Sequence, residues 1–378
     1  MTSRERLMAT LRGEPVDRPA VNFYEIGGFL VDPDDPDPFN VYNSPSWRPL
    51  LELAEAKTDV IRMGMLQPVV GGTGSAAEFY TQETWMEDGA RFTRTTLDAG
   101  ARKLTQLTRR DPGADTVWVV EHMLKDTDDL RCLLDLPDAA FAKAPPDIAA
   151  LERLEADLGD RGIVMVDSSD PICEAAGLFD MAAYTVIAAT EPVLFHRLLE
   201  RLAAPLHRRT EFLAEAFPGH LWRFFGAEYA TEPYLPPALF EEYVVRYTGP
   251  MAEAVRRHGG YARIHSHGRV KNALPHIMAM GADAIDPLEP PPQGDVLLAD
   301  VRREYGRDLA LFGNIEISEI ESMPPAHFRK RAEAAVRDGT EGEGRGFVLM
   351  PSSCPCGRTV SATAMRNYET LAEAVRQA

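Results

Sequence analysis

Short apolar runs rich in β-branched residues recur along the chain, and each is followed by a turn and a stretch in which apolar residues have helical spacing. The long stretches 191–216 and 236–258 show that spacing, with leucines at Leu194, Leu198 and Leu202 in the first. Strands that alternate with helices predict a parallel sheet joined by crossover helices. Runs of this kind occupy 19–23, 58–63, 162–167, 221–226, 261–267, 282–286, 309–314 and 346–351.

Eight strands with eight crossover helices is the count of a (β/α)8 TIM barrel, which needs about 250 residues. The chain has 378 residues, so we expect one α/β barrel over 1–378 that carries an N-terminal helical and β excursion. A Pro/Asp-rich loop insertion is predicted at 31–50. An antiparallel β excursion is predicted at 68–128, where short alternating segments surround an Asp-Gly pair.

Composition and charge narrow the class of function. Hydrophobic residues make up 45% of the chain and charged residues 26%, which is typical of globular proteins. The 58 acidic against 40 basic residues give a net charge of −18, which argues against binding to nucleic acid. No apolar stretch approaches the roughly 20 residues of a membrane span. The chain starts with a polar segment that is unlike a secretion signal. We therefore expect a cytoplasmic protein that acts on a small molecule and has no membrane partner. An oligomer is compatible with the sequence.

The active site of a TIM barrel lies at the C-terminal ends of its strands, and six of the predicted strand ends carry polar side chains. Asp170 and Glu228 are candidates for acid/base catalysis, because two carboxylates in a confined site acquire separate pKa values. A solvated carboxylate at a loop start is the alternative for each. Substrate contacts are expected from Tyr24, Arg263, Asn314 and Asp286. For Arg263 the alternative is an internal salt bridge, and for Tyr24 it is simple packing.

Two histidines, His265 and His267, lie two positions apart at the end of one predicted strand. Side chains at that spacing share a face of a strand. The opposite face carries Ala262 and Ile264, which suit packing beneath outer helices. We therefore expect the two imidazoles to face the barrel interior.

Two neutral imidazoles and a thiolate are suitable zinc ligands. Cys354, or as second choice Cys356, follows the last predicted strand and could supply the thiolate. Three protein ligands would leave an open position for catalysis, whereas binding by both cysteines would close a structural zinc site. A hydrogen-bonded polar cluster without metal is the remaining alternative.

Several longer segments follow one another in a distinctive order. They are RERLMATLRGEPVDRP, GAEYATEPYLPPALFEEYV, the HSHG segment with GADAIDPLEPPPQGD and LFGNIE, and the closing NYETLAEAV. This order, from about residue 3 to 375, resembles the uroporphyrinogen decarboxylase superfamily. The resemblance implies a (β/α)8 barrel. That superfamily contains true decarboxylases and zinc-dependent methyltransferases that act on thiols or corrinoid proteins.

The residues favour the methyltransferase subgroup. The decarboxylases carry Met-Arg-Gln-Ala-Gly-Arg after the first strand, whereas this chain reads Tyr24-Glu25-Ile26-Gly27-Gly28-Phe29, which has no arginine to hold substrate carboxylates. The methyltransferases hold zinc through His-x-Cys and a later Cys. The resemblance assigns these roles to His265 and Cys354, and places His267 where the first Cys would be. Imidazole in place of thiolate raises the net charge of the zinc centre by one, which also suits an oxygen ligand.

The resemblance therefore implies a zinc-dependent methyltransferase or demethylase that moves a methyl group between a small oxygen or thiol substrate and a corrinoid or thiol acceptor. The chain has no Asp-x-His-x-x-Gly motif, so a corrinoid would come from a separate corrinoid protein. Two alternatives remain. One is a metal-independent decarboxylase that uses Asp170, Arg263 and Tyr24, and the other is a non-catalytic barrel with a structural zinc.

Overall fold

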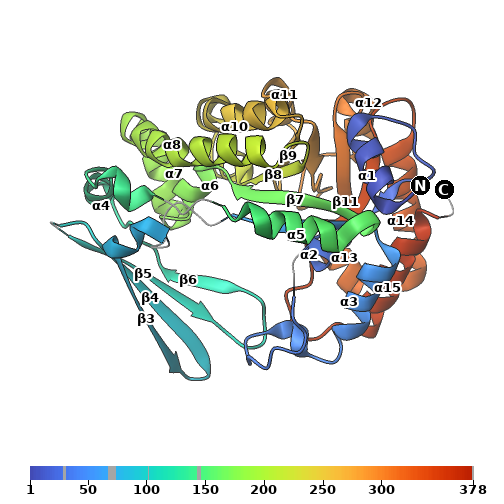
Figure 1. Ribbon diagram of the computed structural model, residues 1–378, viewed down its shortest axis with the longest axis horizontal. Coiled ribbons are helices and arrows are strands. Elements are labelled where there is room, and N and C mark those ends of the chain that lie inside the picture. The colour runs from blue at the N-terminus through green and yellow to red at the C-terminus, as the bar shows by residue number, and fades with distance from the viewer. Residues whose placement is uncertain (29–30, 67–73, 101, 143–145, 377–378) are drawn as a thin grey trace.

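Eight parallel strands form one curled sheet with helices on its outer side (Figure 1). The computed structural model describes residues 1–378 except 29–30, 67–73, 101, 143–145 and 377–378. The strands are β1 (Ala20–Val21), β2 (Val60–Met65), β7 (Gly162–Ser169), β8 (Leu221–Phe225), β9 (Tyr261–His265), β10 (Ala284–Asp286), β11 (Ala310–Ile315) and β12 (Phe347–Pro351). Their order is β1-β12-β11-β10-β9-β8-β7-β2. Each run that the hydrophobic pattern marked overlaps one of these strands, so the predicted TIM-barrel fold is confirmed.

A buried carboxylate bridges β1 and β2, the two ends of this strand order. The backbone N–H of Asp59 donates to the carbonyl oxygen of Val21 over 2.7 Å. In return, the Asp59 carboxylate accepts the N–H of Val21 over 2.9 Å. Arg6 and Arg18 form ion pairs with the same carboxylate at 2.6 and 2.9 Å. These contacts close the barrel where the regular strand ladder stops.

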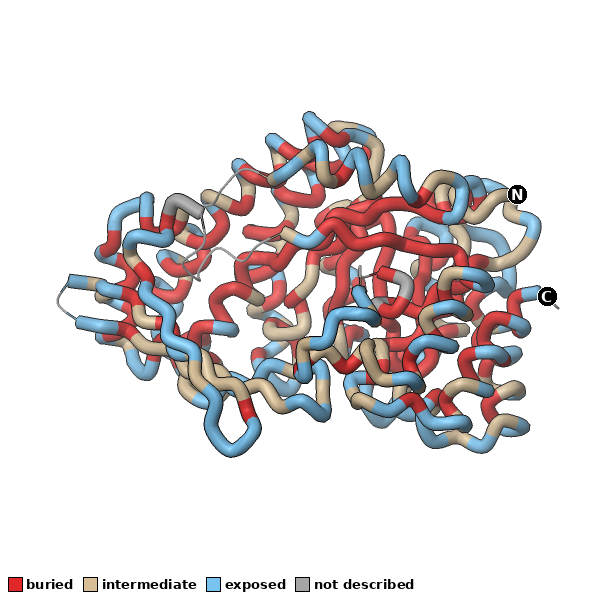
Figure 2. The backbone as a smooth tube through the Cα atoms, turned by 60° about the horizontal axis from the view of Figure 1, so that its bottom comes forward, coloured by how far each residue is buried: buried red, intermediate tan, exposed pale blue. Residues whose placement is uncertain are grey.

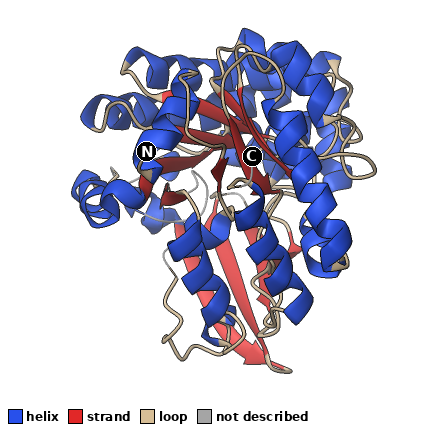
Figure 3. Ribbon diagram, turned by 90° about the vertical axis from the view of Figure 1, so that its right-hand side faces the viewer, coloured by secondary structure: helices blue, strands red, loops and turns tan. Residues whose placement is uncertain are grey.

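Helices cover the outside of the barrel (Figure 3). No helix in the described part of the chain is long and apolar enough to cross a membrane. The leucines that predicted the long helix α8 are all buried beneath it. The helices are α1 (Ser3–Arg12), α2 (Glu25–Gly28), α3 (Arg48–Lys57), α4 (Thr127–Leu134), α5 (Ile148–Leu158), α6 (Pro171–Ala176), α7 (Met181–Thr190), α8 (Pro192–Ala216), α9 (Ala238–Phe240), α10 (Arg246–Arg257), α11 (Leu274–Ala279), α12 (Leu298–Tyr305), α13 (Ile317–Ser322), α14 (Pro325–Thr340) and α15 (Ala362–Ala374).

A second, antiparallel sheet extends from the barrel (Figure 1). Its strands lie in the order β3-β4-β5-β6. Asp88 and Gly89 both have positive φ, 49° and 78°, which allows the tight turn between β3 and β4. The first residues of the predicted excursion, 68–73, lie outside the described part of the chain. The strands are β3 (Tyr80–Glu87), β4 (Ala90–Asp98), β5 (Lys103–Arg110) and β6 (Val117–Glu121).

The barrel strands are buried on both faces (Figure 2). Side chains such as Trp222 and Phe224 point outward and join the core beneath the helices. Side chains such as Met165 and Phe312 point inward and form a separate core that includes Leu11 of α1. Toward the C-terminal ends of the strands, the inward positions become charged or polar. This change along the barrel axis places the candidate site at the same end as the second sheet.

Candidate active site

A cavity of about 550 Å³ lies between the strand ends of the barrel and the antiparallel sheet. Its size is within the range of about 300–1,000 Å³ that is common for small-molecule sites. The barrel contributes Met65, Ser169 and Phe225, and the adjoining α6 contributes Cys173 and Glu174. The sheet contributes Gln82, Thr93, Thr95, Gln106 and Thr108.

Neither histidine lines this cavity, but His265 lies one strand away from it. Phe225, which lines the cavity, is in register with His265 on the neighbouring strand β9. The rings of His265 and His267 are 4.5 Å apart between centroids and nearly perpendicular, at 88°. The structure therefore brings both imidazoles together at the barrel mouth.

The Nδ1 atom of each imidazole is hydrogen-bonded to a carboxylate. Asp286 Oδ2 lies 2.8 Å from His265 Nδ1, and Glu289 Oε1 lies 2.9 Å from His267 Nδ1. Neither Nε2 atom has a hydrogen-bond partner among the described residues. A carboxylate on one ring nitrogen is the arrangement that orients a metal-binding histidine and leaves its other nitrogen for the metal.

Strand β9 ends at His265, so His267 lies in the following turn rather than on the strand. The physical reason is a turn at Gly268, whose φ is 76°. The Gly268 N–H donates to Glu289 Oε2 over 2.6 Å, so Glu289 holds both the turn and the His267 ring. The proximity of the two imidazoles thus depends on Glu289 as well as on strand alternation.

Glu289 and Glu316 form a hydrogen-bonded pair of carboxyl groups behind His267. Burial raises the pKa of Glu316, and the hydrogen bond and negative charge of Glu289 raise it further. Burial also raises the pKa of Glu289, but His267 and the Gly268 N–H outweigh it and lower that pKa overall. For His267, burial lowers the pKa and Glu289 more than compensates. Glu289 is therefore the more acidic carboxyl group of the pair, and Glu316 is the less acidic one.

An ion network fills the barrel interior below the histidines. Arg223 binds Asp167 through two hydrogen bonds, of 2.6 and 2.9 Å. Arg263 Nε lies 2.8 Å from Asp286 Oδ1, but its N–H is not directed at that oxygen, so the contact is a coulombic pair. Burial raises the pKa of Asp286, yet the charges of Arg263 and His265 lower it overall. Asp286 is therefore an anion that contacts both a guanidinium and an imidazole.

The predicted substrate contacts have these positions. The Tyr24 hydroxyl accepts a hydrogen bond from Arg223 and shares another, of 3.3 Å, with His265 Nδ1. Asn314 is buried and its side-chain oxygen accepts a hydrogen bond from Arg331 over 3.3 Å. Arg263 is in the internal ion pair described above. Tyr24 and Arg263 lie in the barrel interior, whereas Asn314 is bound to Arg331 of the outer helix α14. Phe29, the last residue of the first-strand segment, lies outside the described residues.

The predicted acid/base pair is adjacent to α6. Asp170 is buried, and its carboxylate accepts the Cys173 N–H over 2.8 Å and the Thr248 hydroxyl over 3.3 Å. Burial raises the pKa of Asp170 to about 8, and the charge of Glu228 contributes to that rise. Glu228 Oε2 is buried and has no hydrogen-bond partner among the described residues. The two carboxyl groups therefore interact, and Glu228 retains an unused oxygen.

The raised pKa of Asp170 predicts a pH-dependent stability. An unfolded aspartate has a pKa of about 3.9, so between that pH and about 8 the folded chain holds a proton that the unfolded chain has released. Stability due to this group is complete at low pH and is lost as pH rises through that window. We expect the free energy of unfolding to fall by about 3–4 kcal/mol more in the wild type than in Asp170→Asn between pH 5 and 8. Urea unfolding of both proteins measures this difference, and parallel curves would contradict the buried, protonated state.

The two candidate thiols differ in their surroundings. Cys354 is partly buried against the main core. Cys356 is exposed, and its carbonyl oxygen accepts the N–H of Asp115 over 2.7 Å, next to the antiparallel sheet. Within the described residues, no three His, Cys, Asp or Glu side chains are gathered closely enough to hold a metal ion. The structure therefore brings the two imidazoles together but leaves Cys354 outside ligand distance.

Two important residues were not predicted to belong to the site. Asp167 and Arg223 occupy inward positions of otherwise apolar strands, in register with each other. The same two-residue alternation that identified the inward face of β9 applies to these strands. A charged residue on that face was the signal that could have identified both.

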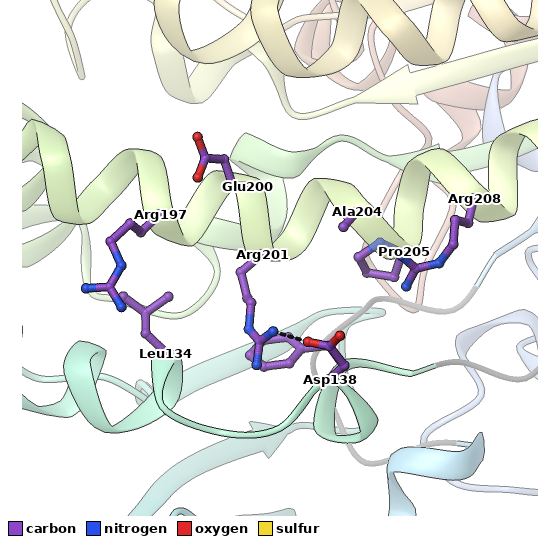
Figure 4. Close-up of a pocket in the computed structure, with 9 residues that line it drawn as sticks. Leu134, Asp138, Arg197, Glu200, Arg201, Ala204, Pro205 and Arg208 are labelled. Atoms are coloured by element: carbon purple, nitrogen blue, oxygen red, sulfur yellow. Dashed lines mark hydrogen bonds and ion pairs between the residues drawn. The ribbon is translucent and has the colours of Figure 1, made fainter.

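A different hollow, of about 420 Å³, lies on the outside of the barrel (Figure 4). Arg197, Arg201 and Arg208 line it from helix α8, and Arg201 forms an ion pair with Asp138. None of its lining residues comes from a strand end. The cavity at the barrel mouth is therefore the one that accompanies the candidate chemistry.

The structure is thus a TIM barrel whose strand ends carry two adjacent imidazoles and buried carboxylates. The family model of uroporphyrinogen decarboxylase (URO-D) matches residues 111–378, which is the greater part of the sequence. The chain belongs to the uroporphyrinogen decarboxylase family. No curated protein matches its sequence.

Comparison with solved structures finds similarity at low sequence identity. A methyltransferase from Methanosarcina mazei has a TM-score of 0.60 and 15% identity, over 100% of this chain and 99% of that one. A B12-independent methionine synthase from Shewanella sp. W3-18-1, in complex with selenomethionine, has a TM-score of 0.41 and 10% identity, over 81% and 79% of the two chains. The first likeness shows that the two chains share a fold.

Proposed function

We propose that this protein is a zinc-dependent methyltransferase or demethylase that moves a methyl group between a small oxygen or thiol compound and a thiol or corrinoid acceptor. The observation that carries the proposal is the pair of adjacent imidazoles, each with a buried carboxylate at Nδ1. Carboxylates in this position fix the ring tautomer and raise the basicity of Nε2. The fold shared with the Methanosarcina mazei methyltransferase supports the same activity.

His265 and His267 would hold the zinc ion, with Cys354 as third ligand after a local approach of its segment. The donor set of two nitrogens and one sulfur suits zinc. The unpartnered Oε2 of Glu228 supplies a further oxygen at the same end of the barrel. Bound zinc would lower the pKa of a thiol or activate an oxygen of the substrate. Three ligands leave a coordination position free for that atom.

The chain's own groups bind and orient the reactants. Asp286 and Glu289 hold the imidazoles, and Tyr24 connects Arg223 to His265. Asp170, with its pKa near 8, can donate or accept a proton near neutral pH, in keeping with an acid/base role. The antiparallel sheet covers one side of the cavity. A separate corrinoid protein would deliver or take the methyl group at the cavity opening.

A metal-independent decarboxylase receives less support from the same geometry. Such an enzyme needs cations to hold substrate carboxylates. Arg223 and Arg263 are the arginines in the barrel interior, and each already has an aspartate partner in the described structure. A carboxylated substrate would have to displace one of those buried partners.

Metal content of protein purified without chelator or affinity metal tests the proposal. We expect about one zinc per chain, and we expect Cys354→Ser to lose zinc while the matched variant Cys356→Ser keeps it, because only Cys354 faces the core. Methyl transfer from methylated oxygen and thiol compounds to cobalamin or a thiol should depend on that zinc. Absence of zinc, together with no binding on titration, would refute the proposal, and the reverse behaviour of the two serines would move the third ligand to Cys356.

A further inference from the structure

On the face of the antiparallel sheet that lines the cavity, the polarity of the side chains differs from one cross-strand row to the next. The register places one row deep in the core, one row of amides and a threonine, and one row of hydroxyl groups. In that order the rows are Tyr80, Leu97 and Leu104; Gln82, Thr95 and Gln106; and Thr84, Thr93 and Thr108. All members of the second and third rows except Thr84 line the cavity, and none of them carries a charge.

These polar groups are partly satisfied among themselves. Gln82 Nε2 donates to Thr95 Oγ1 over 3.2 Å, and Thr84 and Thr93 share a hydrogen bond of 3.1 Å. The side-chain amide of Gln106 has no hydrogen-bond partner among the described residues. Gln106 therefore presents both a donor and an acceptor to a ligand in the cavity.

The opposite wall is mainly apolar. Its side chains include Met65, Leu66, Met123, Leu178 and Phe225. Among the described residues that line the cavity, the one carboxylate is that of Glu174, which accepts a 2.5 Å hydrogen bond from the Ser169 hydroxyl. None of the described residues that line the cavity is a lysine or an arginine.

We propose that this cavity selects an electrically neutral substrate, with an apolar body against the barrel wall and a hydrogen-bonding group against Gln106 and the threonine row. This inference rests on the proposed function only in taking the ligand to be a compound that carries the transferred methyl group. A ligand carboxylate in the cavity would lose water without meeting a cation, which is strongly unfavourable. A neutral ether or thioether has no such penalty, and its apolar part gains burial.

Two probes that differ by one carboxylate test this selection. They are 1,2-dimethoxybenzene and 3,4-dimethoxybenzoate, whose binding to the full chain can be measured by equilibrium dialysis. We expect the neutral probe to bind at least about tenfold more tightly. Equal or tighter binding of the benzoate, or binding of neither probe, would overturn the inference.

Variants of the threonine face locate the binding site. Thr108→Lys places a cation in the cavity and should reduce or reverse the preference for the neutral probe, with Gln106→Lys as a second variant if the first is unstable. Thr81 is exposed on the other face of the same sheet, so Thr81→Lys adds the same charge outside the cavity and should leave the preference unchanged. A preference that survives both cavity variants, or that changes equally in Thr81→Lys, would place the ligand elsewhere.

Measurements on zinc-loaded and chelator-treated protein separate this inference from the proposed function. The charge preference comes from the cavity wall, so we expect it in both forms. A neutral preference in a protein that binds no zinc would refute the proposed function and leave the cavity inference standing. A protein that binds zinc but prefers the benzoate would refute the cavity inference and leave the proposed function standing.

Discussion

Replacing His265 by alanine is expected to lower the affinity for zinc by about 10³-fold and to abolish methyl transfer. The estimate follows because a structural zinc site has a binding free energy of roughly 10–16 kcal/mol, divided among about four ligands. His265 is buried and its ring is already oriented by Asp286, so no neighbouring side chain can replace it. Zinc titration with a competing chelator and elemental analysis of the purified variant measure the loss.

Two comparisons make the result specific to the proposed ligand. His327 is exposed on α14, so His327→Ala should keep full zinc content. Glu289→Gln retains the shape of the group that holds His267 but removes its charge, and we expect a smaller loss of about 10–100-fold. A folded His265→Ala protein that binds zinc as tightly as the wild type would refute the ligand assignment.

The barrel could be predicted because the sequence patterns of its strands and helices are local. Each strand is a short apolar run, and each crossover helix has its own spacing of leucines, so neither requires knowledge of distant contacts. The same alternation indicated that His265 and His267 lie on one side. It placed the end of β9 two residues late, because the turn at Gly268 is held by Glu289 from the next strand end. That contact joins positions more than twenty residues apart and leaves no local signal.

The cavity is the part that local patterns could not predict. Phe225 on β8 and Thr95 on β4 line the same cavity although more than a hundred residues separate them in the chain. Sequence alternation assigns each to a face of its own strand, but it does not say how the two sheets are placed. The pairing of Arg223 with Asp167 is intermediate, since both positions are inward by alternation and only their adjacency depends on the order of the strands.

Replacing Asp167 by alanine is expected to lower the free energy of unfolding by about 3–5 kcal/mol. Arg223 would then lie in the barrel interior with its charge unpaired, because its side chain is 6% exposed and Asp167 accepts two of its hydrogen bonds. Its remaining hydrogen-bond partner among the described residues is the hydroxyl group of Tyr24, and the nearby Asp286 is already paired with Arg263. Urea unfolding of the wild type and the variant measures the difference.

Removal of both charges distinguishes the effect of an unpaired cation from the effect of lost packing. The double variant Asp167→Leu with Arg223→Met keeps the volume filled and leaves no buried charge, so we expect it to recover most of the lost stability. The exposed pair of Asp300 and Arg303 provides the surface comparison, and Asp300→Ala should cost less than about 1 kcal/mol. Recovered stability without recovered zinc affinity in the double variant would show that the ion network positions Tyr24 and His265 as well as supporting the fold. If the double variant were as unstable as Asp167→Ala, loss of packing rather than an unpaired charge would be the cause.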